Sequence, residues 1–213
     1  MKTDELISLL ANDATPIAPN GARKRFQAAL LLGGLGALAL MLLGYGVRAD
    51  LGHALVEPMF WIKLAFPLGI AIPALVLTSR LSRPGTRLGR MWMALPVPWL
   101  VIAAMAVLVL VKAPSADRFA LVVGQTWLAC AFNIALISTP VLAAVLWAVK
   151  GLAPTRPALA GASAGLASAA VGATVYALHC PEMQAPFLAI WYVLGMLIPT
   201  LAGALIGAKW LRW

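Results

Sequence analysis

The sequence is short of charge, and of acids in particular. Only 11% of its 213 residues are charged, seven Asp and Glu against sixteen Lys and Arg, while 62% are hydrophobic. A soluble domain carries about 25% charged residues, so this chain has too few ions to cover a water-exposed surface. The few acids are scattered, and no HExxH or CxxC motif and no triad with a carboxylate partner occurs. These shortages exclude a soluble domain and argue against an enzyme.

Long apolar runs stand where the charges are missing. Six windows reach the roughly 20 apolar residues that a helix needs to span a bilayer. Backbone polar groups cannot stay unpaired in lipid, so we expect these windows to be helices. The predicted fold is all-α, a polytopic membrane protein with a bundle of six transmembrane helices. Its spans are residues 27–47, 58–79, 91–111, 124–148, 157–178 and 185–208.

Prolines and small residues add detail to these spans. A proline inside a helix removes a backbone donor and predicts a local bend. Small residues at every fourth position, as in Gly161, Gly165 and Ala169, predict close helix packing. Such faces also permit a homodimer without requiring one. The prolines concerned are Pro67, Pro73, Pro96, Pro98, Pro140 and Pro199, and the second small-residue pair is Gly203 and Gly207.

Basic residues gather on one side of the predicted spans. An even number of spans puts both termini on the same side, and that side receives twelve of the sixteen Lys and Arg, against three on the other. Loops on the cytoplasmic side of a membrane carry the excess of positive charge. Both termini are therefore predicted to be cytoplasmic, and the net charge of +9 reflects this topology rather than nucleic-acid binding.

The first 22 residues have a pattern of their own. Leucines recur there at the spacing of one helical face, acids lie beside them, and residues 16–21 read as a flexible connector. We expect a short cytoplasmic amphipathic helix with its linker at residues 1–22, ahead of a membrane domain at residues 23–213. The residues that carry the pattern are Asp4, Glu5, Leu6, Leu9, Leu10 and Asp13.

The charge of this segment bears on what the leucines contact. A helix of about ten residues is marginal alone in water and is ordered by burying its apolar face. Helices that rest on a membrane surface favour Lys and Arg on the polar face, whereas residues 3–22 hold three acids and no base. A protein partner is therefore favoured, with the membrane surface as the alternative.

The few reactive side chains lie toward the opposite face. Cysteine and histidine occur twice each, and "HCPEM" at residues 179–183 holds one of each. Helical rise places Cys130 roughly 28 Å and Cys180 roughly 34 Å above the loop that joins the fourth and fifth spans. The thiols thus stand at similar heights on antiparallel neighbours, where a modest shift brings them to the Cα separation of about 4.4–6.8 Å that a disulfide needs.

Two kinds of chemistry suit this cluster. Two cysteines outside the cytoplasm can pair as a disulfide, or thiolate and imidazole can bind a soft metal ion transiently. A buried cysteine can also be only a small hydrophobe. No resident cofactor is expected. The disulfide candidates are Cys130 and Cys180; the candidate metal ligands are these two and His179, then Glu182, Met183 and His53.

Lys63 is the one charged side chain well inside a predicted span. An intramembrane charge is a functional candidate by default. This one lies near the outer boundary, where a lysine can extend its ammonium to the interface. We expect it either to reach water in this way or to bind a structural partner.

The whole chain resembles the NrsF-type membrane anti-sigma factors, small six-span bacterial proteins that restrain an extracytoplasmic-function sigma factor. The resemblance rests on "MKTDELISLLA" at the start, "FWIKLAFPL" at residues 60–68, "HCPEM", and "FLAIWYVLGM" at residues 187–196. It implies that residues around Asp4–Asp13 bind the sigma factor and that Cys130 and Cys180 respond to heavy metal or oxidant. The implied protein is not an enzyme, lies in the bacterial inner membrane and does not contact nucleic acid directly.

The main alternative is a small-solute or metal-ion transporter. Transporters place polar or ionised groups near the bilayer midplane, at broken helices. Here the midplane offers little beyond Asn133, Ser138, Thr139 and the proline bends. The regulator interpretation is therefore preferred.

Overall fold

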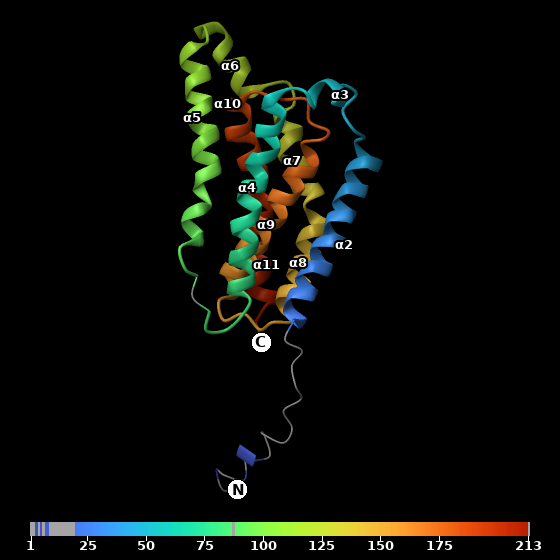
Figure 1. Cartoon of the computed structure of the whole chain (residues 1–213), viewed down its shortest axis with the longest axis vertical. Coiled ribbons are helices and arrows are strands. Elements are labelled where there is room, and N and C mark those ends of the chain that lie inside the picture. The colour runs from blue at the N-terminus through green and yellow to red at the C-terminus, as the bar shows by residue number, and fades with distance from the viewer. Residues whose placement is uncertain (1–2, 4, 6, 9–19, 87, 213) are drawn as a thin grey trace.

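Apolar helices run the length of the computed structural model, which describes residues 3, 5, 7–8, 20–86 and 88–212 (Figure 1). Six helical stretches are long and apolar enough to cross a membrane, and no strand occurs among the residues described. The predicted all-α fold with six spans is confirmed. The stretches are Gly21–Gly44, Pro58–Leu81, Met91–Lys112, Ser115–Lys150, Pro157–Tyr176 and Ala185–Trp210.

The first three spans are close to their predicted limits. Helices α2 (Gly21–Gly44) and α4 (Pro58–Leu81) are joined through the short α3 (Leu51–Ala54), and α4 continues through both of its internal prolines. A 3₁₀ turn, η1 (Met91–Ala94), leads into α5 (Pro96–Lys112). Pro96 was expected to bend the third span, but it occupies the first turn of α5, where its missing N–H leaves no helical hydrogen bond unmade.

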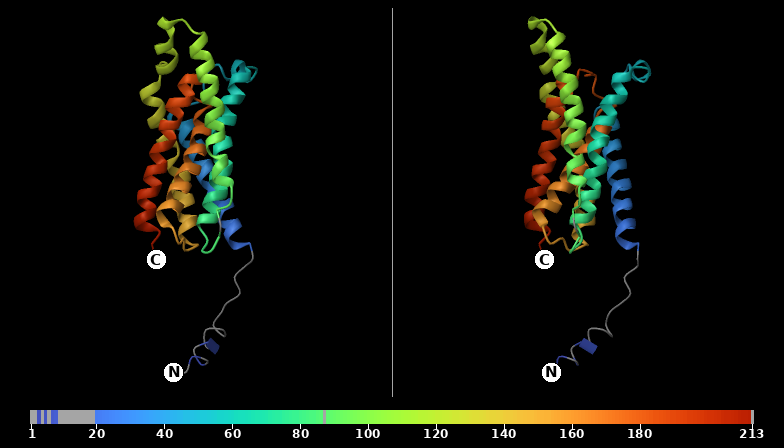
Figure 2. Two further views of the ribbon diagram at one scale, coloured as in Figure 1. Left: turned by 90° about the vertical axis from the view of Figure 1, so that its left-hand side faces the viewer. Right: turned by 60° about the vertical axis from the view of Figure 1, so that its left-hand side comes forward.

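The fourth crossing is built from three helices rather than one. They are α6 (Ser115–Val123), α7 (Trp127–Ile137) and α8 (Thr139–Lys150). Gly124 ends α6 at a positive φ of 60°. The break between α7 and α8 falls at Ser138, two residues before Pro140, so the predicted interruption there is confirmed. Sequence reasoning missed α6, which forms a hairpin with α5 that extends past the rest of the bundle (Figure 2).

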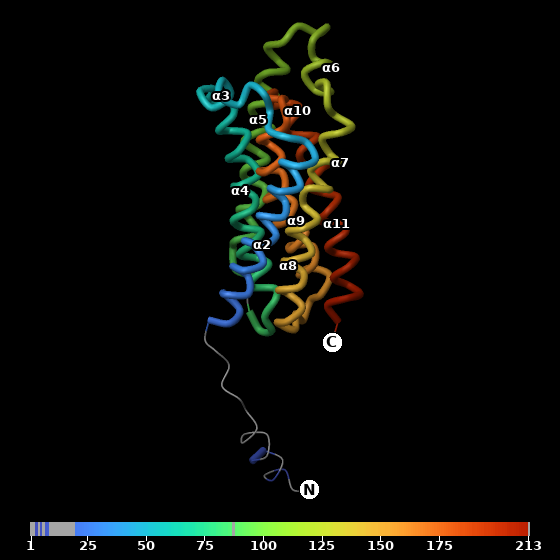
Figure 3. The backbone as a smooth tube through the Cα atoms, turned by 90° about the vertical axis from the view of Figure 1, so that its right-hand side faces the viewer, coloured from blue at the N-terminus to red at the C-terminus, as the bar shows by residue number. Residues whose placement is uncertain are grey.

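The last two spans meet at the end of the bundle that is uppermost in Figure 1. Helix α9 (Pro157–Tyr176) is followed by residues 177–184, and the sixth span begins there as α10 (Ala185–Phe187). It continues through a π-helical turn, η2 (Leu188–Tyr192), into α11 (Val193–Trp210). Single π-turns inside helices are frequent at functional sites. The beginning of α2 and the end of α11 both lie at the opposite, lower end (Figure 3).

Helix α9 is the centre of the bundle and packs against α4, α7, α8 and α11. Its small residues allow the closest approach, toward α11. A Cβ at Gly161 would overlap the carbonyl oxygen of Gly203, and one at Gly165 would overlap the carbonyl oxygen of Pro199. The predicted packing role of these glycines is confirmed, because the small-residue faces of the fifth and sixth spans meet each other within one chain.

The substitution Gly161→Ala tests this contact. The added methyl group forces α9 and α11 apart, and overpacking of this kind costs about 1–3 kcal/mol. We expect a lower thermal unfolding midpoint in detergent micelles. Gly34→Ala is the matched control, since a Cβ there meets nothing within 4 Å. Equal midpoints for the two variants would contradict the proposed close packing.

Candidate functional site

Residues 177–184, here called the cysteine loop, bring the rare reactive side chains together at the upper end of the bundle. The last turn of α9 runs on into this loop, because the N–H groups of His179 and Cys180 both donate to the carbonyl of Tyr176, at 2.9 and 3.0 Å. Pro181 follows and cannot continue a helix. The turn leaves Cys180 facing inward, with no exposed surface.

The two cysteines form a pair inside this end of the bundle. Cys130 lies in the first turn of α7, where its N–H donates to the carbonyl of Thr126 at 2.8 Å. Both thiols are free and fully buried, and each lies near enough to influence the ionisation of the other. The structure therefore brings together two sulfurs that are 50 residues apart in the sequence.

Glu182 fixes the cysteine loop to the start of α7. Its Oε1 accepts hydrogen bonds from the backbone N–H groups of Gln125 at 2.7 Å and Thr126 at 3.2 Å. A carboxylate at the N-terminus of a helix satisfies orphan donors and complements the helix dipole. A Cβ at Gly124 would lie 2.8 Å from the same oxygen, so this glycine also leaves room for the cap. The carboxylate thus positions the helix that carries Cys130.

Lys63 reaches the cysteine loop from α4. Its ammonium donates to the carbonyl oxygens of Cys180 at 2.6 Å and Glu182 at 2.8 Å, and the side chain is fully buried. The ring of Tyr192 lies 5.8 Å from Nζ, within the range of a cation–π contact. Of the two outcomes expected for this lysine, the structural partner is the one found. Sequence reasoning could not name that partner, because main-chain carbonyls leave no mark in a sequence.

Arg48 holds the other side of the loop. It lies in the connection after α2 and donates to the carbonyl of Cys180 at 3.3 Å and to Asp50 at 2.7 Å. This hydrogen bond lowers the pKa of the exposed Asp50 carboxyl to about 2. Asp50 therefore keeps its charge as the pH falls through the ordinary range of an aspartate, and the ion pair that orients Arg48 persists there.

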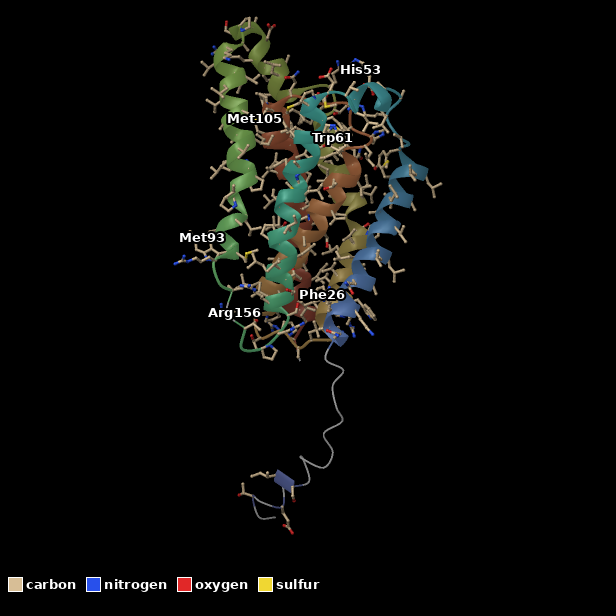
Figure 4. All side chains as sticks on the ribbon, in the orientation of Figure 1. Phe26, His53, Trp61, Met93, Met105 and Arg156 are labelled. Atoms are coloured by element: carbon tan, nitrogen blue, oxygen red, sulfur yellow. The ribbon has the colours of Figure 1, made fainter. Side chains whose placement is uncertain are left out.

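The remaining candidate ligands either have other contacts or lie apart from the thiols. His179 Nδ1 donates to the carbonyl of Gly46 at 3.0 Å, since a carbonyl can only accept. The sulfur of Met183 lies 3.9 Å from Arg48. His53 is exposed on α3, at the upper end (Figure 4). Within the part of the chain that the structure describes, no three His, Cys, Asp or Glu side chains lie close enough to hold a metal ion. Of the predicted ligands, the structure joins only Cys130 and Cys180.

The surroundings of Cys180 favour its thiolate. The hydrogen bond from the Cys130 thiol, and after it the Lys63 ammonium and the N–H of Glu182, lower the pKa of the Cys180 thiol. Burial acts in the opposite direction, because it disfavours charge. The hydrogen bonds and the nearby ammonium outweigh it.

The polar groups expected at the midplane are satisfied internally. Asn133 accepts from the hydroxyl of Tyr45 at 2.9 Å, and Ser138 donates to the carbonyl of Ile134 at 2.6 Å. Thr139 donates to the carbonyl of Leu136 at 2.7 Å. Each of these polar groups therefore has a hydrogen-bond partner within the protein, and none of the contacts indicates a binding site for a transported solute.

The expected sigma-binding residues lie almost entirely outside the described part of the chain. Asp4, Leu6, Leu9, Leu10 and Asp13 fall there. Glu5 is described, is helical and is exposed, and its carbonyl accepts from the hydroxyl of Ser8 at 2.9 Å. The role of this segment stays a prediction.

The fold and the site together define a class: a six-helix membrane protein whose reactive groups are one buried thiol pair under a tightly anchored loop. Comparison with known proteins then identifies the family. Residues 10–213 match the family model of NrsF, the negative regulator of sigma F. Over the full length of both chains, the sequence is 47% identical to the probable anti-sigma-F factor NrsF of Azospira oryzae. It is 39% identical to the anti-sigma-F factor NrsF of Caulobacter vibrioides, again over both full lengths.

The chain therefore belongs to the NrsF family of anti-sigma factors, and the resemblance drawn from its motifs is confirmed. Members of this family are regulators and not enzymes, as expected from the scarcity of acids. No solved structure matches the chain.

The Glu182 cap gives a testable prediction. Loss of a helix cap costs about 0.5–2 kcal/mol, so Glu182→Ala should lower the thermal unfolding midpoint and loosen the first turn of α7. Hydrogen exchange at the amides of Gln125 and Thr126 should rise. Glu57→Ala is the matched control, because Glu57 precedes α4 without a side-chain capping bond. Unchanged exchange in Glu182→Ala would show that the carboxylate does not hold this helix.

Proposed function

We propose that this protein holds an extracytoplasmic-function sigma factor inactive through its cytoplasmic N-terminal segment and releases it when Cys130 and Cys180 are oxidised to a disulfide. The observation that carries the proposal is the pair of free, buried thiols that lie near each other under an anchored loop. The relatives named as anti-sigma-F factors support the sigma-factor partner.

The distribution of charge supports a topology in which both termini are cytoplasmic. The predicted topology assigns twelve of the sixteen Lys and Arg to the side on which both termini lie. Arg156 lies at the lower end of the bundle, where α2 begins and α11 ends, and His53 at the other (Figure 4). Positive charge marks the cytoplasmic side, so the cysteine loop faces the opposite compartment. Stimulus and sigma factor then act on opposite sides of the membrane.

The chemical step is the loss of two protons and two electrons from the two thiols as the S–S bond forms. Hydrogen peroxide accepts them and is reduced to two molecules of water. Because neither thiol has exposed surface, the oxidant has to be small. The described residues join two thiols and bring no third ligand to them, so oxidation is preferred to metal coordination as the stimulus.

A mechanical connection links the thiol pair to the N-terminal segment. Cys130 lies on α7, and α7 meets α8 at the break around Ser138. Near its lower end, α8 is bound to the start of α2: Arg25 donates to the carbonyl of Trp147 at 2.8 Å and lies 4.0 Å from its ring. A shift of α7 that pivots at the break is passed to α2, and so to residues 1–20 ahead of it. Couplings between sites are typically about 1–3 kcal/mol, or 5–150-fold in affinity.

The thiol requirement is tested with the double variant Cys130→Ser, Cys180→Ser. In bacterial membranes, peroxide treatment should lower the affinity of the full-length protein for its sigma factor by about 5–150-fold. The affinity of the double variant should stay unchanged. Co-purification of the sigma factor measures both. Equal release from the two proteins would refute the thiol switch. Release by a soft metal ion while both thiols stay reduced would replace oxidation by coordination.

The connection through α2 is tested with Arg25→Gln. Loss of the guanidinium separates α2 from Trp147, so disulfide formation should proceed as before while release of the sigma factor falls several-fold. The neighbouring exposed residue supplies the control, Lys24→Gln. If Arg25→Gln releases the sigma factor as the control does, the signal does not pass through this contact.

A further inference from the structure

Two buried polar groups face the Cys180 sulfur, and each lacks the partner that its chemistry calls for. The Lys63 ammonium is fully buried, yet its acceptors are two neutral carbonyls. In the described part of the chain it forms no ion pair. The hydroxyl of Tyr192 is also buried; among the described residues no nitrogen or oxygen is hydrogen-bonded to it, and its neighbour is the Cys180 sulfur. Buried charges and buried donors without partners are costly, so their convergence on one atom calls for an explanation.

We propose that Cys180 is the thiol that reacts first, as a thiolate, that Lys63 and Tyr192 stabilise its negative charge, and that Cys130 is the resolving thiol that completes the disulfide. This inference rests on the proposed function, because it divides the work between the two sulfurs of that switch. A thiolate at Cys180 supplies what is missing at each group: an anion for the ammonium and an acceptor for the hydroxyl.

The charged and titratable groups around Cys180 also favour a thiolate at this position. Two cations, Arg48 and Lys63, act on Cys180, while the one carboxylate near the thiol pair, that of Glu182, acts on Cys130. The carboxylate of Glu182, the nearest acid in the sequence, is turned toward the backbone N–H groups before α7. The groups that face Cys180 are Arg48 from the loop after α2, Lys63 from α4, Cys130 from α7, Tyr176 from α9 and Tyr192 from η2.

The two thiols are not equivalent in this setting. Both cations of the site donate to the main-chain carbonyl of Cys180, Lys63 at 2.6 Å and Arg48 at 3.3 Å, whereas among the described residues no cation is hydrogen-bonded to Cys130. The thiolate, and not the thiol, is the nucleophile in cysteine chemistry, so the first attack belongs to Cys180.

The reaction balances in two steps. The Cys180 thiolate attacks one oxygen of a peroxide, an S–O bond forms as the O–O bond breaks, and the leaving hydroxide takes up a proton to give water. The product is a sulfenic acid. The Cys130 sulfur then attacks the sulfur of that sulfenic acid; the S–S bond forms, the S–O bond breaks, and water leaves with the Cys130 proton.

The order of the two thiols is tested by trapping the sulfenic acid in full-length protein in bacterial membranes. Cys130→Ser removes the resolving thiol, so after peroxide treatment Cys180 should be labelled by dimedone, a reagent for sulfenic acids. Cys180→Ser should leave Cys130 labelled at least about 10-fold less, since one pKa unit of thiolate formation corresponds to tenfold. Equal labelling, or stronger labelling of Cys130, overturns the assignment.

The roles of Lys63 and Tyr192 are tested by the pH dependence of iodoacetamide alkylation at Cys180, resolved by mass spectrometry. In the wild type, the midpoint should lie below the ordinary cysteine value of about 8.5. Lys63→Met should raise the midpoint by about one unit, or tenfold in rate at neutral pH, and Tyr192→Phe should shift it in the same direction. Lys63→Arg should restore it. Lys150→Met, which removes a lysine stacked on Trp210 at the lower end, should leave it unchanged.

Each outcome bears on one proposal or the other. A wild-type midpoint above about 8.5 overturns the inference even if Lys63→Met fails to fold. The inference is also overturned if a folded Lys63→Met variant shows the wild-type midpoint for Cys180 alkylation. If the disulfide forms through Cys180 but the sigma factor stays bound, the proposed function fails and the inference stands. If Cys130 reacts first and the sigma factor is still released, the inference about Cys180 fails and the proposed function stands.

Discussion

The hydrogen bonds from the Lys63 ammonium to the carbonyls of Cys180 and Glu182 tie the upper end of this bundle together. Through them α4 holds the loop between α9 and α10. The side chain of Glu182 extends the tie to α7, and Arg48 extends it to the connection after α2. A bilayer offers no water to replace such bonds, so polar groups near its boundary are satisfied by the chain itself. The thiol pair lies where these ties converge, and small changes at the sulfurs therefore reach several helices.

Much of this architecture could be predicted from the sequence, because it depends on regularities of the chain itself. The lengths of the apolar runs predicted the six spans. The four-residue spacing of small residues predicted the close packing that the structure shows between α9 and α11. Helical rise alone placed Cys130 and Cys180 at similar heights. Each of these arguments uses distances along one helix, or between two helices joined by a short loop, and such distances are fixed by backbone geometry.

The rest of the site depends on contacts that a sequence does not encode locally. Lys63 binds main-chain carbonyls more than a hundred residues away, and every residue type has a carbonyl. Glu182 was expected as a metal ligand, but the open backbone N–H groups before α7 are its partners, and they exist only because α6 ends at Gly124. Helix α6 itself was missed because its first turn holds Asp117 and Arg118, and charge there resembles a loop. The sequence contained the right residues, and the packing decided their partners.

In the proposed switch, the charge of the site gives oxidation of the thiols a way to act on the surrounding helices. With Cys180 as a thiolate, the buried Lys63 ammonium has an anion beside it; in the disulfide it has neutral partners only. Opposite unit charges about 4 Å apart attract by about 4 kcal/mol at an effective dielectric constant of about 20. That exceeds the roughly 1–3 kcal/mol of a typical coupling between sites. In the proposed switch, loss of the anion would weaken the hold of Lys63 on the cysteine loop, and the α7–α8 crossing would move with that loop. Oxidation would then act by removing the charge beside a buried lysine as well as by joining the two sulfurs.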